Sequence, residues 1–411
     1  MNVLHLNTQF AALGGVEAVL QFHHEADHLH GMSSRFISLW EPHHEGFPRA
    51  RFLDFTSSLR IAHARRLMAD AWPGFSPDIA LHHTPWGQPF LLDLDHAARR
   101  VLMLHSDVPA LRSLAARRLP FMDGAIGVSD VLVSKAKEAA PGWSPDRFLR
   151  IDYPVHPPAW LAQRPRQRTP SERRELVLGF AGRLESAQKR VERFIELSQR
   201  LATLPIPWRI EFLGDGSLRP TLEAALPDRL SHRFLGRLSH DAYWRAVASW
   251  DAIVFTSDFE GTPIALIEAV TAGVVPFHPN LGCGGDDYSR LIDPGLVYAP
   301  GDMEALANSI AAFASWEPAR HARAVESAKA VATRHDAHLY LRRMATFLSH
   351  VASLPSPAAR PASPRWFFPL DRLRFSDIER LSALAKRVRS LNLRDHACGI
   401  LRAGRHAPRK G

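Results

Sequence analysis

Short apolar runs alternate with longer amphipathic stretches along most of the chain. In residues 1–156 the runs at 3–6, 36–39, 79–82, 101–104 and 124–128 have the length and composition of buried strands. The stretches between them follow helical periodicity. This alternation is typical of a parallel sheet that is covered by helices on both faces.

The same alternation resumes in a second region. Predicted strands lie at 176–180, 208–213, 231–234, 252–255 and 274–277, and a last one lies near 296–297, before a helix that opens around Asp302. Residues 157–175 between the two regions are rich in Pro and Arg and have no apolar period, which predicts a linker. We therefore expect two α/β domains, 1–156 and 176–334, each a Rossmann-like doubly wound unit. They would face a central cleft, where the carboxyl ends of strands bind ligands.

A helix at 335–352 follows and could cross back to the first domain. The remaining residues, 353–411, begin with a Pro-rich stretch. The residues from 360 onward hold 13 basic and 4 acidic side chains, which accounts for the whole net charge of +9. The body of the protein is formally neutral, so the high pI does not predict a nucleic-acid-binding body.

The basic tail has more than one interpretation. In residues 365–394, Trp366, Phe367 and Phe368 precede a basic amphipathic helix, a combination that suits an anionic membrane surface. Alternatively, the helix at 378–391 packs on the body or forms a solvated arm. The N-terminus does not read as a signal peptide, and no apolar run is long enough to span a bilayer. With only Cys283 and Cys398, no disulfide framework or metal cluster is expected. A cytoplasmic location fits, peripheral on the inner face of the membrane if the tail binds there.

The segment 258–273 (DFEGTPIALIEAVTAG) carries two carboxylates eight positions apart, between two predicted strands. Glu260 lies in the turn after the first strand, and Glu268 lies about five residues into a helix that Gly273 closes. Thr262 is the predicted N-cap and Pro263 the first helical residue. Free N–H groups at the start of this helix could bind a phosphate or a polyhydroxylated ligand.

Two further loops could bind an anion. Arg183 and Lys189 follow the strand that ends at Phe180, and both cations could hold a diphosphate there. The alternative is that they are solvated surface residues. Gly14 and Gly15 follow the first strand and open a helix, which allows a pyrophosphate to approach the backbone, although a glycine pair is often only a tight turn.

The order and spacing of four motifs resemble glycosyltransferase family 4 (glycosyl transferases group 1), whose members are retaining enzymes of the GT-B fold. The motifs are GGVE at 14–17, AGR…K at 181–189, GDG at 214–216 and EGTPIALIEA at 260–269. The resemblance covers nearly all of residues 1–350. It implies a transferase that moves a sugar from a nucleotide-sugar to a hydroxyl acceptor, a glycan or a lipid-linked sugar, in the synthesis of cell-surface glycan, lipopolysaccharide or glycolipid.

The resemblance also implies roles for individual residues. Arg183 and Lys189 would stabilise the departing nucleoside diphosphate, Glu260 would hold the donor sugar and phosphate, and His105 would lie near the transferred sugar. With 22 histidines in the chain, an incidental role for His105 stays open. The implied donor-binding residues are Gly14, Gly15, Gly182, Gly214, Leu238, Gly261, Thr262, Ile264, Ala265 and Glu268, with Glu268 on the ribose hydroxyls. Two positions depart from the family pattern. Arg190 stands where the family frequently has glycine, which predicts a more basic or differently shaped diphosphate loop. The loop 281–288 replaces the family's short glycine loop that ends in Glu, so the sugar contacts of the second domain do not carry over.

No metal or other cofactor is expected. The histidine pairs at 23–24, 43–44 and 82–83 point in different directions, and no cysteine or carboxylate completes a site. Retention would proceed by same-face attack, since no second carboxylate stands out as a covalent nucleophile. Three other classes of protein are alternatives. They are a GT-B sugar-nucleotide epimerase, a Rossmann oxidoreductase, which would need a G-x-G-x-x-G motif that the first strand-to-helix turn lacks, and a nucleic-acid-binding protein that uses the basic tail.

Overall fold

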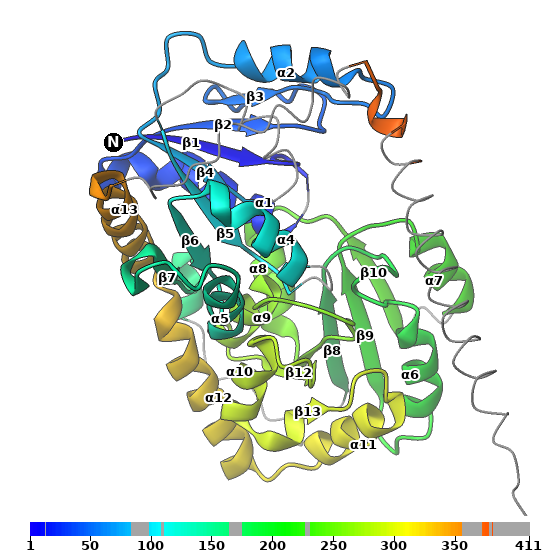
Figure 1. The fold of residues 1–411 in the computed structure, drawn as a ribbon. Helices are drawn as coiled ribbons and strands as arrows, with labels where there is room; N and C mark the ends of the chain where they lie inside the picture. Colours follow the sequence, from blue (N-terminus) through cyan, green and yellow to red (C-terminus); the bar gives the residue numbers. More distant parts are fainter. Residues whose placement is uncertain are drawn as a thin grey trace, which may run out of the picture.

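The computed structural model describes residues 1–12, 14–83, 98–107, 111–163, 175–226, 231–355, 372–377 and 380. Two α/β domains stand one above the other, the first in blue to cyan and the second in green to yellow (Figure 1). Each domain has a parallel sheet between layers of helices, as the alternation of apolar runs and amphipathic stretches predicts.

The first domain contains a seven-stranded sheet in the order β3-β2-β1-β4-β5-β6-β7, and every described pair of strands is parallel. Its strands are β1 (Asn2–Asn7), β2 (Ser33–Ser38), β3 (Ala50–Phe52), β4 (Ile79–His82), β5 (Arg99–Leu104), β6 (Gly124–Gly127) and β7 (Phe148–Arg150). The sequence did not predict β3 and β7. Both are three-residue edge strands that contain an arginine, and they are too short to give a continuous apolar run.

Helices cover both faces of this sheet. They are α1 (Gly15–Ala26), η1 (Asp27–His30), α2 (Ile61–Ala69), α4 (Leu111–Arg118), η2 (Leu119–Phe121), α5 (Asp130–Ala139) and η3 (Pro145–Arg147). Ser129 is the N-cap of α5, and its side chain accepts from the N–H of Leu132 at 3.4 Å. The cap explains why a serine stands directly after β6.

The second domain contains a six-stranded parallel sheet in the order β10-β9-β8-β11-β12-β13. The strands are β8 (Leu176–Ala181), β9 (Trp208–Leu213), β10 (His232–Gly236), β11 (Ala252–Val254), β12 (Val275–Pro279) and β13 (Val297–Tyr298). The helices are α6 (Arg193–Leu201), α7 (Arg219–Ala225), α8 (His240–Ser249), α9 (Ile264–Thr271), α10 (Gly285–Ile292), η6 (Pro294–Leu296), α11 (Met303–Ala314), α12 (Pro318–Ala332) and η7 (Thr333–His335).

The start of α9 differs from the prediction. Its N-cap is Pro263, with no side-chain cap, and the first helical residue is Ile264. Thr262 does not cap the helix because its hydroxyl donates instead to the carbonyl of Val128 in the first domain, at 3.4 Å. At the other end, Gly273 has a positive φ of 77°, as expected of a glycine that closes a helix.

The last helix of the body returns to the first domain. After α12, α13 (Ala337–Ser353) packs its apolar face into the first domain's core, with Leu341, Met344 and Leu348 among the buried residues. Figure 1 shows it beside β1, well away from α11. The described part of the linker contains a short helix, η4 (Ala159–Gln163), in which Trp160 Nε1 donates to Asp241 Oδ1 at 2.6 Å.

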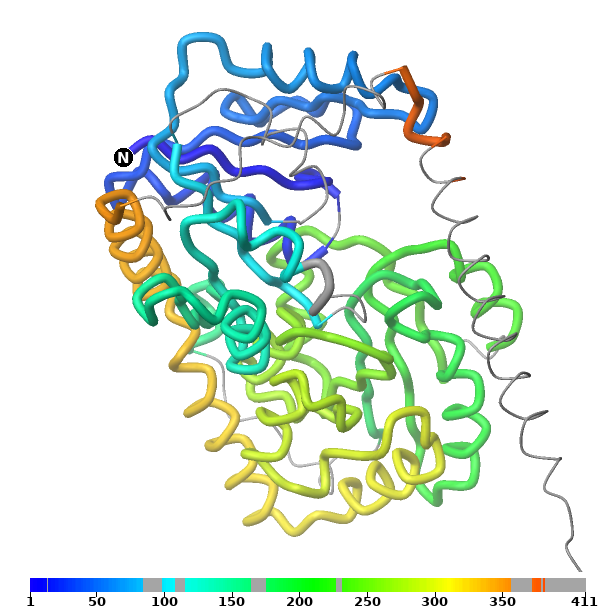
Figure 2. The backbone as a smooth tube through the Cα atoms, viewed as in Figure 1, coloured from blue at the N-terminus to red at the C-terminus, as the bar shows by residue number. Residues whose placement is uncertain are grey.

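A short piece of the tail docks on the first domain. The N–H groups of Ile61, Phe375 and Ser376 donate across the contact to the carbonyls of Leu373, Leu59 and Ser57 at 3.0, 3.2 and 2.8 Å. Phe375 is 5% exposed and joins an apolar cluster with Phe55. This orange segment lies against the upper domain in Figure 2. Apart from Arg380, the predicted helix at 378–391 and Trp366–Phe368 lie outside the described residues.

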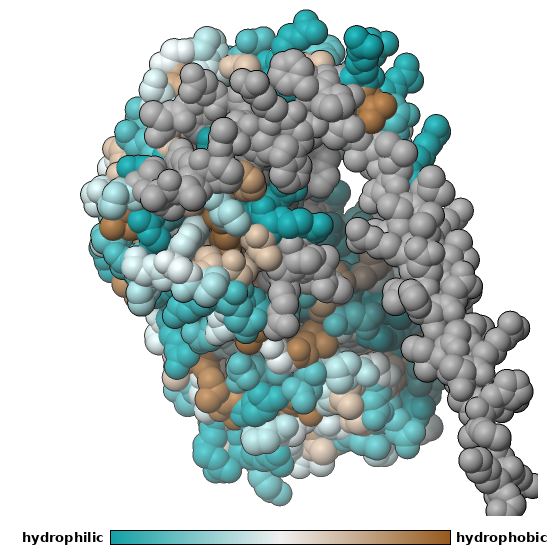
Figure 3. Space-filling view, in the orientation of Figure 1, coloured by the Kyte–Doolittle hydropathy of each residue, from teal (hydrophilic) through white to brown (hydrophobic). Residues whose placement is uncertain are grey.

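On the described residues that Figure 3 colours, hydrophobic residues stand among hydrophilic ones. Within the described ranges, no helix combines the length and the hydropathy that crossing a membrane requires.

Candidate functional site

The loops that follow β5 and β11 meet where the two domains join. The N–H of Asp107 donates to the carbonyl of Glu260 at 3.1 Å. A Cβ at Gly261 would lie only 2.3 Å from the carbonyl oxygen of His105, closer than side-chain carbons approach other atoms. Glycine at 261 therefore permits this close approach. The fold thus brings together two predicted site segments that are about 150 residues apart in the sequence.

Two helix N-termini converge at the same junction. Gly15 is the first residue of α1, and a Cβ built there would lie 3.2 Å from Cδ1 of Ile264, the first residue of α9. No described residue accepts a hydrogen bond from the backbone N–H of Ile264 or Ala265. Each helix N-terminus carries a partial positive charge, so the junction favours an anion.

Arg183 adds a full positive charge to this junction. It lies in the loop after β8 with an exposed side chain, and among the described residues it forms no ion pair. Its charge acts on Glu17 in the first turn of α1, where it opposes the burial that raises the pKa of Glu17. The positive charge of Arg183 therefore acts on the first turn of the helix that follows Gly14.

Lys189, the other predicted cation, is already paired. Its Nζ donates to Glu260 Oε1 at 2.7 Å, and the two side chains are only 15% and 5% exposed. Gln188 Nε2 and Ser257 Oγ also donate to the Glu260 carboxylate, at 3.0 and 2.6 Å. The charge of Lys189 is thus balanced by a buried carboxylate, and three donors fix that carboxylate in place.

Gly182 and Gly214 allow the loops beneath Lys189 to pack closely. Gly214 has a φ of 126°, and a Cβ there would lie 2.0 Å from the carbonyl oxygen of Gly182. A Cβ at Gly182 would in turn lie 3.6 Å from Cε of Lys189. Both glycines therefore shape the loops around the Lys189–Glu260 pair.

Glu268 lies in the fifth position of α9, where the hydroxyl of Tyr243 from α8 donates to its Oε2. Burial raises the pKa of Glu268 to about 7, and the Tyr243 hydrogen bond partly opposes that rise. The group therefore changes charge near neutral pH. Leu238 follows β10, at the carboxyl end of the second domain's sheet, and its side chain is 37% exposed.

The ring of His105 is engaged on both sides by residues of the first domain. Its Nδ1 is 2.5 Å from the hydroxyl of Tyr153, and its Nε2 is 3.0 Å from Nδ1 of His83. Burial lowers the pKa of His105 to about 3, so the ring is neutral at physiological pH. The part of His105 that meets the second domain is its backbone carbonyl, beside Gly261.

Sequence reasoning missed Gln188, Ser257, Tyr243 and Tyr153, which hold predicted site residues in position. Gln188 is adjacent to Lys189 and Ser257 stands three residues before Glu260, but nothing in that spacing distinguishes a partner from a solvated polar residue. The two tyrosines come from elements far away in the sequence. Only the packing of the elements reveals them.

The loop at 281–288 contributes a buried thiol. Cys283 is 1% exposed, its Sγ lies 3.4 Å from the carbonyl of Gly261, and burial raises its pKa to about 12. A thiol with a raised pKa is a poor nucleophile. Cys398 lies outside the described residues.

The expectation that no carboxylate would approach the histidine pairs is wrong at one position. Oxygens of Asp27 lie 3.2 Å from Nε2 of His5 and 2.7 Å from Nδ1 of His23. The ligand-type atoms of these three buried residues lie within 4.8 Å of one another. The sequence missed the group because His5 stands alone in an apolar strand and Asp27 follows α1.

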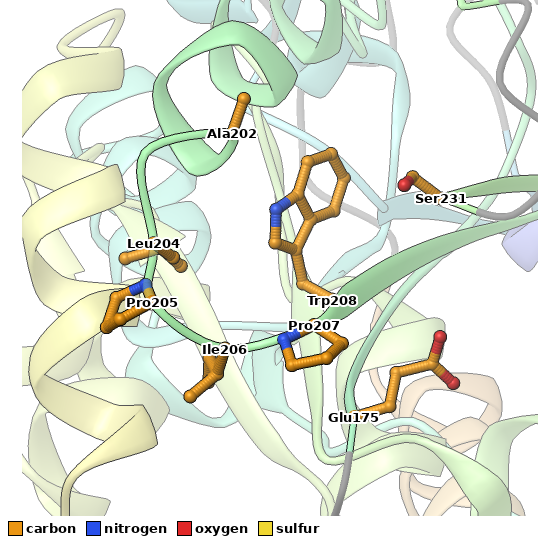
Figure 4. A pocket seen from close by; sticks show the side chains of 8 residues that line it. All are labelled: Glu175, Ala202, Leu204, Pro205, Ile206, Pro207, Trp208 and Ser231. Atoms are coloured by element: carbon orange, nitrogen blue, oxygen red, sulfur yellow. The ribbon is translucent and has the colours of Figure 1, made fainter.

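The pocket in Figure 4 is not part of this junction. It is an open hollow of about 470 Å³ at the amino ends of β8 and β9, lined by Glu175, Trp208, Ser231 and neighbouring apolar residues. Ligands of open α/β sheets bind at the opposite, carboxyl ends of the strands. The junction of the two domains is therefore the better candidate.

Solved structures of glycosyltransferases share this architecture. A variant of S. aureus TarM in complex with fondaparinux, alpha-GlcNAc-glycerol and UDP matches with a TM-score of 0.67 and 9% identity, over 84% of this chain and 99% of that one. WaaG, a glycosyltransferase involved in lipopolysaccharide biosynthesis, matches with a TM-score of 0.65 and 19% identity over 84% and 99%. Anabaena HepE in complex with UDP-glucose gives 0.64 and 17% over 86% and 100%. The fold is therefore the GT-B fold, as predicted.

The sequence comparisons identify the second domain. Residues 163–331 match the family model "Glycosyl transferases group 1", so the chain carries a domain of that family. The lipopolysaccharide 1,6-galactosyltransferase of Salmonella typhimurium is 29% identical over 144 residues. That alignment spans 33% of this chain and 38% of the relative. The family resemblance predicted from the motifs is thus confirmed at the level of a group 1 domain.

Proposed function

We propose that this protein is a retaining glycosyltransferase that moves a sugar from a nucleotide-sugar to a hydroxyl acceptor, in the synthesis of lipopolysaccharide or another cell-surface glycan. The observation that carries the proposal is the convergence of the N-termini of α1 and α9, together with the charge of Arg183, which acts on the first turn of α1. This junction favours a diphosphate. The group 1 domain and the similarity to a lipopolysaccharide galactosyltransferase support the reaction class.

In this proposal the diphosphate of the donor lies between Gly15 and the N–H groups of Ile264 and Ala265. Arg183 stabilises the charge that develops as the nucleoside diphosphate leaves. Glu268 accepts hydrogen bonds from the ribose hydroxyls, and Leu238 contacts the base. Lys189 acts from its fixed position beside Glu260.

Same-face attack, with the leaving phosphate accepting the proton of the acceptor hydroxyl, suits this junction better than a covalent intermediate. A nucleophilic carboxylate needs an oxygen that is free to attack the sugar. Both oxygens of Glu260 already accept hydrogen bonds, from Lys189 and Ser257 on one side and from Gln188 on the other. These contacts support a positioning role for Glu260.

The test is release of nucleoside diphosphate by the full chain from a panel of sugar-nucleotides, first UDP-glucose and UDP-galactose, with and without a lipopolysaccharide-core acceptor. Arg183→Ala should lower kcat by about 100-fold or more, because it removes an exposed cation from a preorganised anion site. Arg342→Ala, an exposed arginine on α13, is the matched control and should leave kcat unchanged.

Unchanged turnover in Arg183→Ala would count against the assignment. Turnover without acceptor that yields an isomerised sugar-nucleotide would instead identify an epimerase. The anomeric configuration of the product, read by NMR, would decide between retention and inversion.

A further inference from the structure

A continuous chain of buried polar side chains runs through the first domain and ends at the interdomain junction. Its members in order are Tyr153, His105, His83, His5, Asp27, His23 and Tyr340. The distances between successive polar atoms are 2.5, 3.0, 3.0, 3.2, 2.7 and 2.8 Å in that order. Every member except His105 is less than 5% exposed.

The sheet topology creates this chain. His5 lies in β1, His83 directly follows β4, and His105 directly follows β5. Because β1, β4 and β5 are neighbours in the sheet and all run parallel, the three rings stack side by side toward its carboxyl edge. Asp27 and His23 come from the C-terminal end of α1, which packs beside β1.

The hydrogen-bond geometry fixes where each proton resides. Ionised Asp27 can only accept, so His5 donates from Nε2 and His23 donates from Nδ1. His5 Nδ1 must then accept from His83 Nε2, because a neutral imidazole carries one proton. By the same rule His83 Nδ1 accepts from His105 Nε2, and His105 Nδ1 accepts from the Tyr153 hydroxyl.

The charge states support this order. Burial lowers the pKa of His5 to about 4 and that of His105 to about 3, and it lowers the pKa of His83 well below its ordinary value. The pKa of Asp27 is lowered despite its burial, because His23 and His5 donate to it. On one side of Asp27, the rings of His5, His83 and His105 are therefore neutral, and their N–H groups are directed toward the carboxylate.

We propose that Asp27 acts through His5 and His83 as a positioning residue that fixes the ring and the Nε2–H tautomer of His105. Both nitrogens of that ring are then occupied within the protein, so His105 serves the reaction through its backbone. The carbonyl of His105 abuts Gly261, and two residues later the N–H of Asp107 holds the carbonyl of Glu260. The hydrogen-bonded side chains from Asp27 to His105 thereby fix the position of the first-domain loop that contacts Gly261 and Glu260. Their role in turnover rests on the proposed function.

Stability alone does not explain these buried polar side chains, because apolar residues of similar volume would often stabilise the fold equally well. A fully satisfied polar network has a single low-energy arrangement, whereas an apolar core can repack. His105 needs a single arrangement of this kind, because its carbonyl contacts Gly261 of the other domain at close range.

The first test reads the proton positions directly. In protein labelled with ¹⁵N-histidine, long-range ¹H–¹⁵N correlation spectra distinguish the two neutral tautomers, and His105→Gln assigns the resonance. We expect His105 to carry its proton on Nε2 near neutral pH. A proton on Nδ1 would overturn the proposal whether or not the protein transfers sugar.

The second test replaces the residues at either end of the series that fixes the tautomer of His105. In Asp27→Asn the side chain can donate through its amide, so His5 no longer has to donate, and the tautomer of His105 should change or become mixed. Tyr153→Phe removes the donor at the other end and should leave the Nε2–H tautomer in place. Asp251→Asn, a buried aspartate of the second domain that accepts from the N–H of Val177, is the matched control and should change nothing.

Turnover gives the third readout. Asp27→Asn should lower kcat by about tenfold or more with little effect on KM for the donor, because it disturbs the fit of the two domains rather than a donor contact. Wild-type tautomer and unchanged kcat in a folded Asp27→Asn protein would refute the positioning role. If Asp27→Asn does not fold, the tautomer of His105 in the wild type and in Tyr153→Phe still decides whether the positioning role holds.

A bound metal ion is the competing outcome. Coordination by His5 and His23 would use the lone pairs of Nε2 and Nδ1, and the proton order along the chain would reverse. Metal analysis of the purified protein distinguishes the two. A stoichiometric metal together with Nδ1-protonated His105 would overturn the proposal, and a metal-free protein with Nε2-protonated His105 would support it.

Discussion

The raised pKa of Glu268 predicts a pH-dependent stability that a single substitution removes. The pKa of this carboxyl rises from 4.5 to about 7 on folding, mainly through burial. Between pH 4.5 and about pH 7, Glu268 therefore keeps its proton in the folded protein but has lost it in the unfolded chain. The stabilisation from this proton is complete below about pH 4.5 and is lost as the pH rises through 7.

The magnitude follows from the size of the shift. A pKa difference of one unit corresponds to about 1.4 kcal/mol, so between about pH 5 and pH 8.5 the wild type should lose on the order of 2 to 3 kcal/mol from this group. Glu268→Gln has no proton to lose. Its stability relative to the wild type should therefore rise by that amount over the same range, which is roughly 5 °C in Tm.

The assay is a series of thermal melts of both proteins at matched ionic strength from pH 5 to 8.5. Glu326→Gln, an exposed glutamate paired with Lys329 on α12, is the control and should follow the wild type. Tyr243→Phe removes the hydrogen bond that lowers the Glu268 pKa, so the transition should move to higher pH. A difference between wild type and Glu268→Gln that stays flat across the range would refute the reasoning.

Four further outcomes test the site and the fold. Gly261→Ala should lower kcat at least tenfold, because its Cβ would clash with the first domain at 2.3 Å, whereas Gly142→Ala, with open space around it, should not. Lys189→Met should destabilise the protein by about 3 kcal/mol or more in urea unfolding, because it strands the buried charge of Glu260. Lys189→Met combined with Glu260→Gln should recover part of that loss. Phe375→Ala should cost about 3 kcal/mol through the cavity it leaves in the first domain, and an unchanged urea midpoint would show that the tail segment is not docked in solution. Treatment with EDTA should leave turnover unchanged if no metal takes part, and loss of turnover that added metal restores would contradict this.

The long apolar runs made the fold predictable. Strands such as β8 and β11 are buried at every position, and a fully buried strand is a continuous apolar run in the sequence. Short edge strands carry no such signal, and β3 and β7 were missed for that reason. The start of α9 was misplaced because Thr262 finds a partner in the other domain, which no local capping rule can anticipate.

The site was predictable as a set of loops but not as a set of contacts. Parallel topology places the loops after β1, β5, β8 and β11 at carboxyl edges, so glycines and cations there were reasonable candidates. The partner of each cation depends on side chains whose separation in the sequence carries no information. Lys189 and Glu260 are 71 positions apart, and nothing in either motif indicates that they neutralise each other.

In the proposed function, the positive charge at the junction takes the place of a metal ion in holding the diphosphate. The Lys189–Glu260 pair is neutral as a unit, so the positive charge that remains comes from Arg183 and from the helix ends. Each helix N-terminus contributes roughly half a positive charge, so α1 and α9 together with Arg183 supply about two. Glu17, in the first turn of α1, reduces this positive charge when it is ionised, and burial raises its pKa and so favours the neutral form. Loss of Arg183 should therefore impair anion binding more than its exposed position suggests, whereas Lys189 contributes chiefly by holding the turn that begins α9.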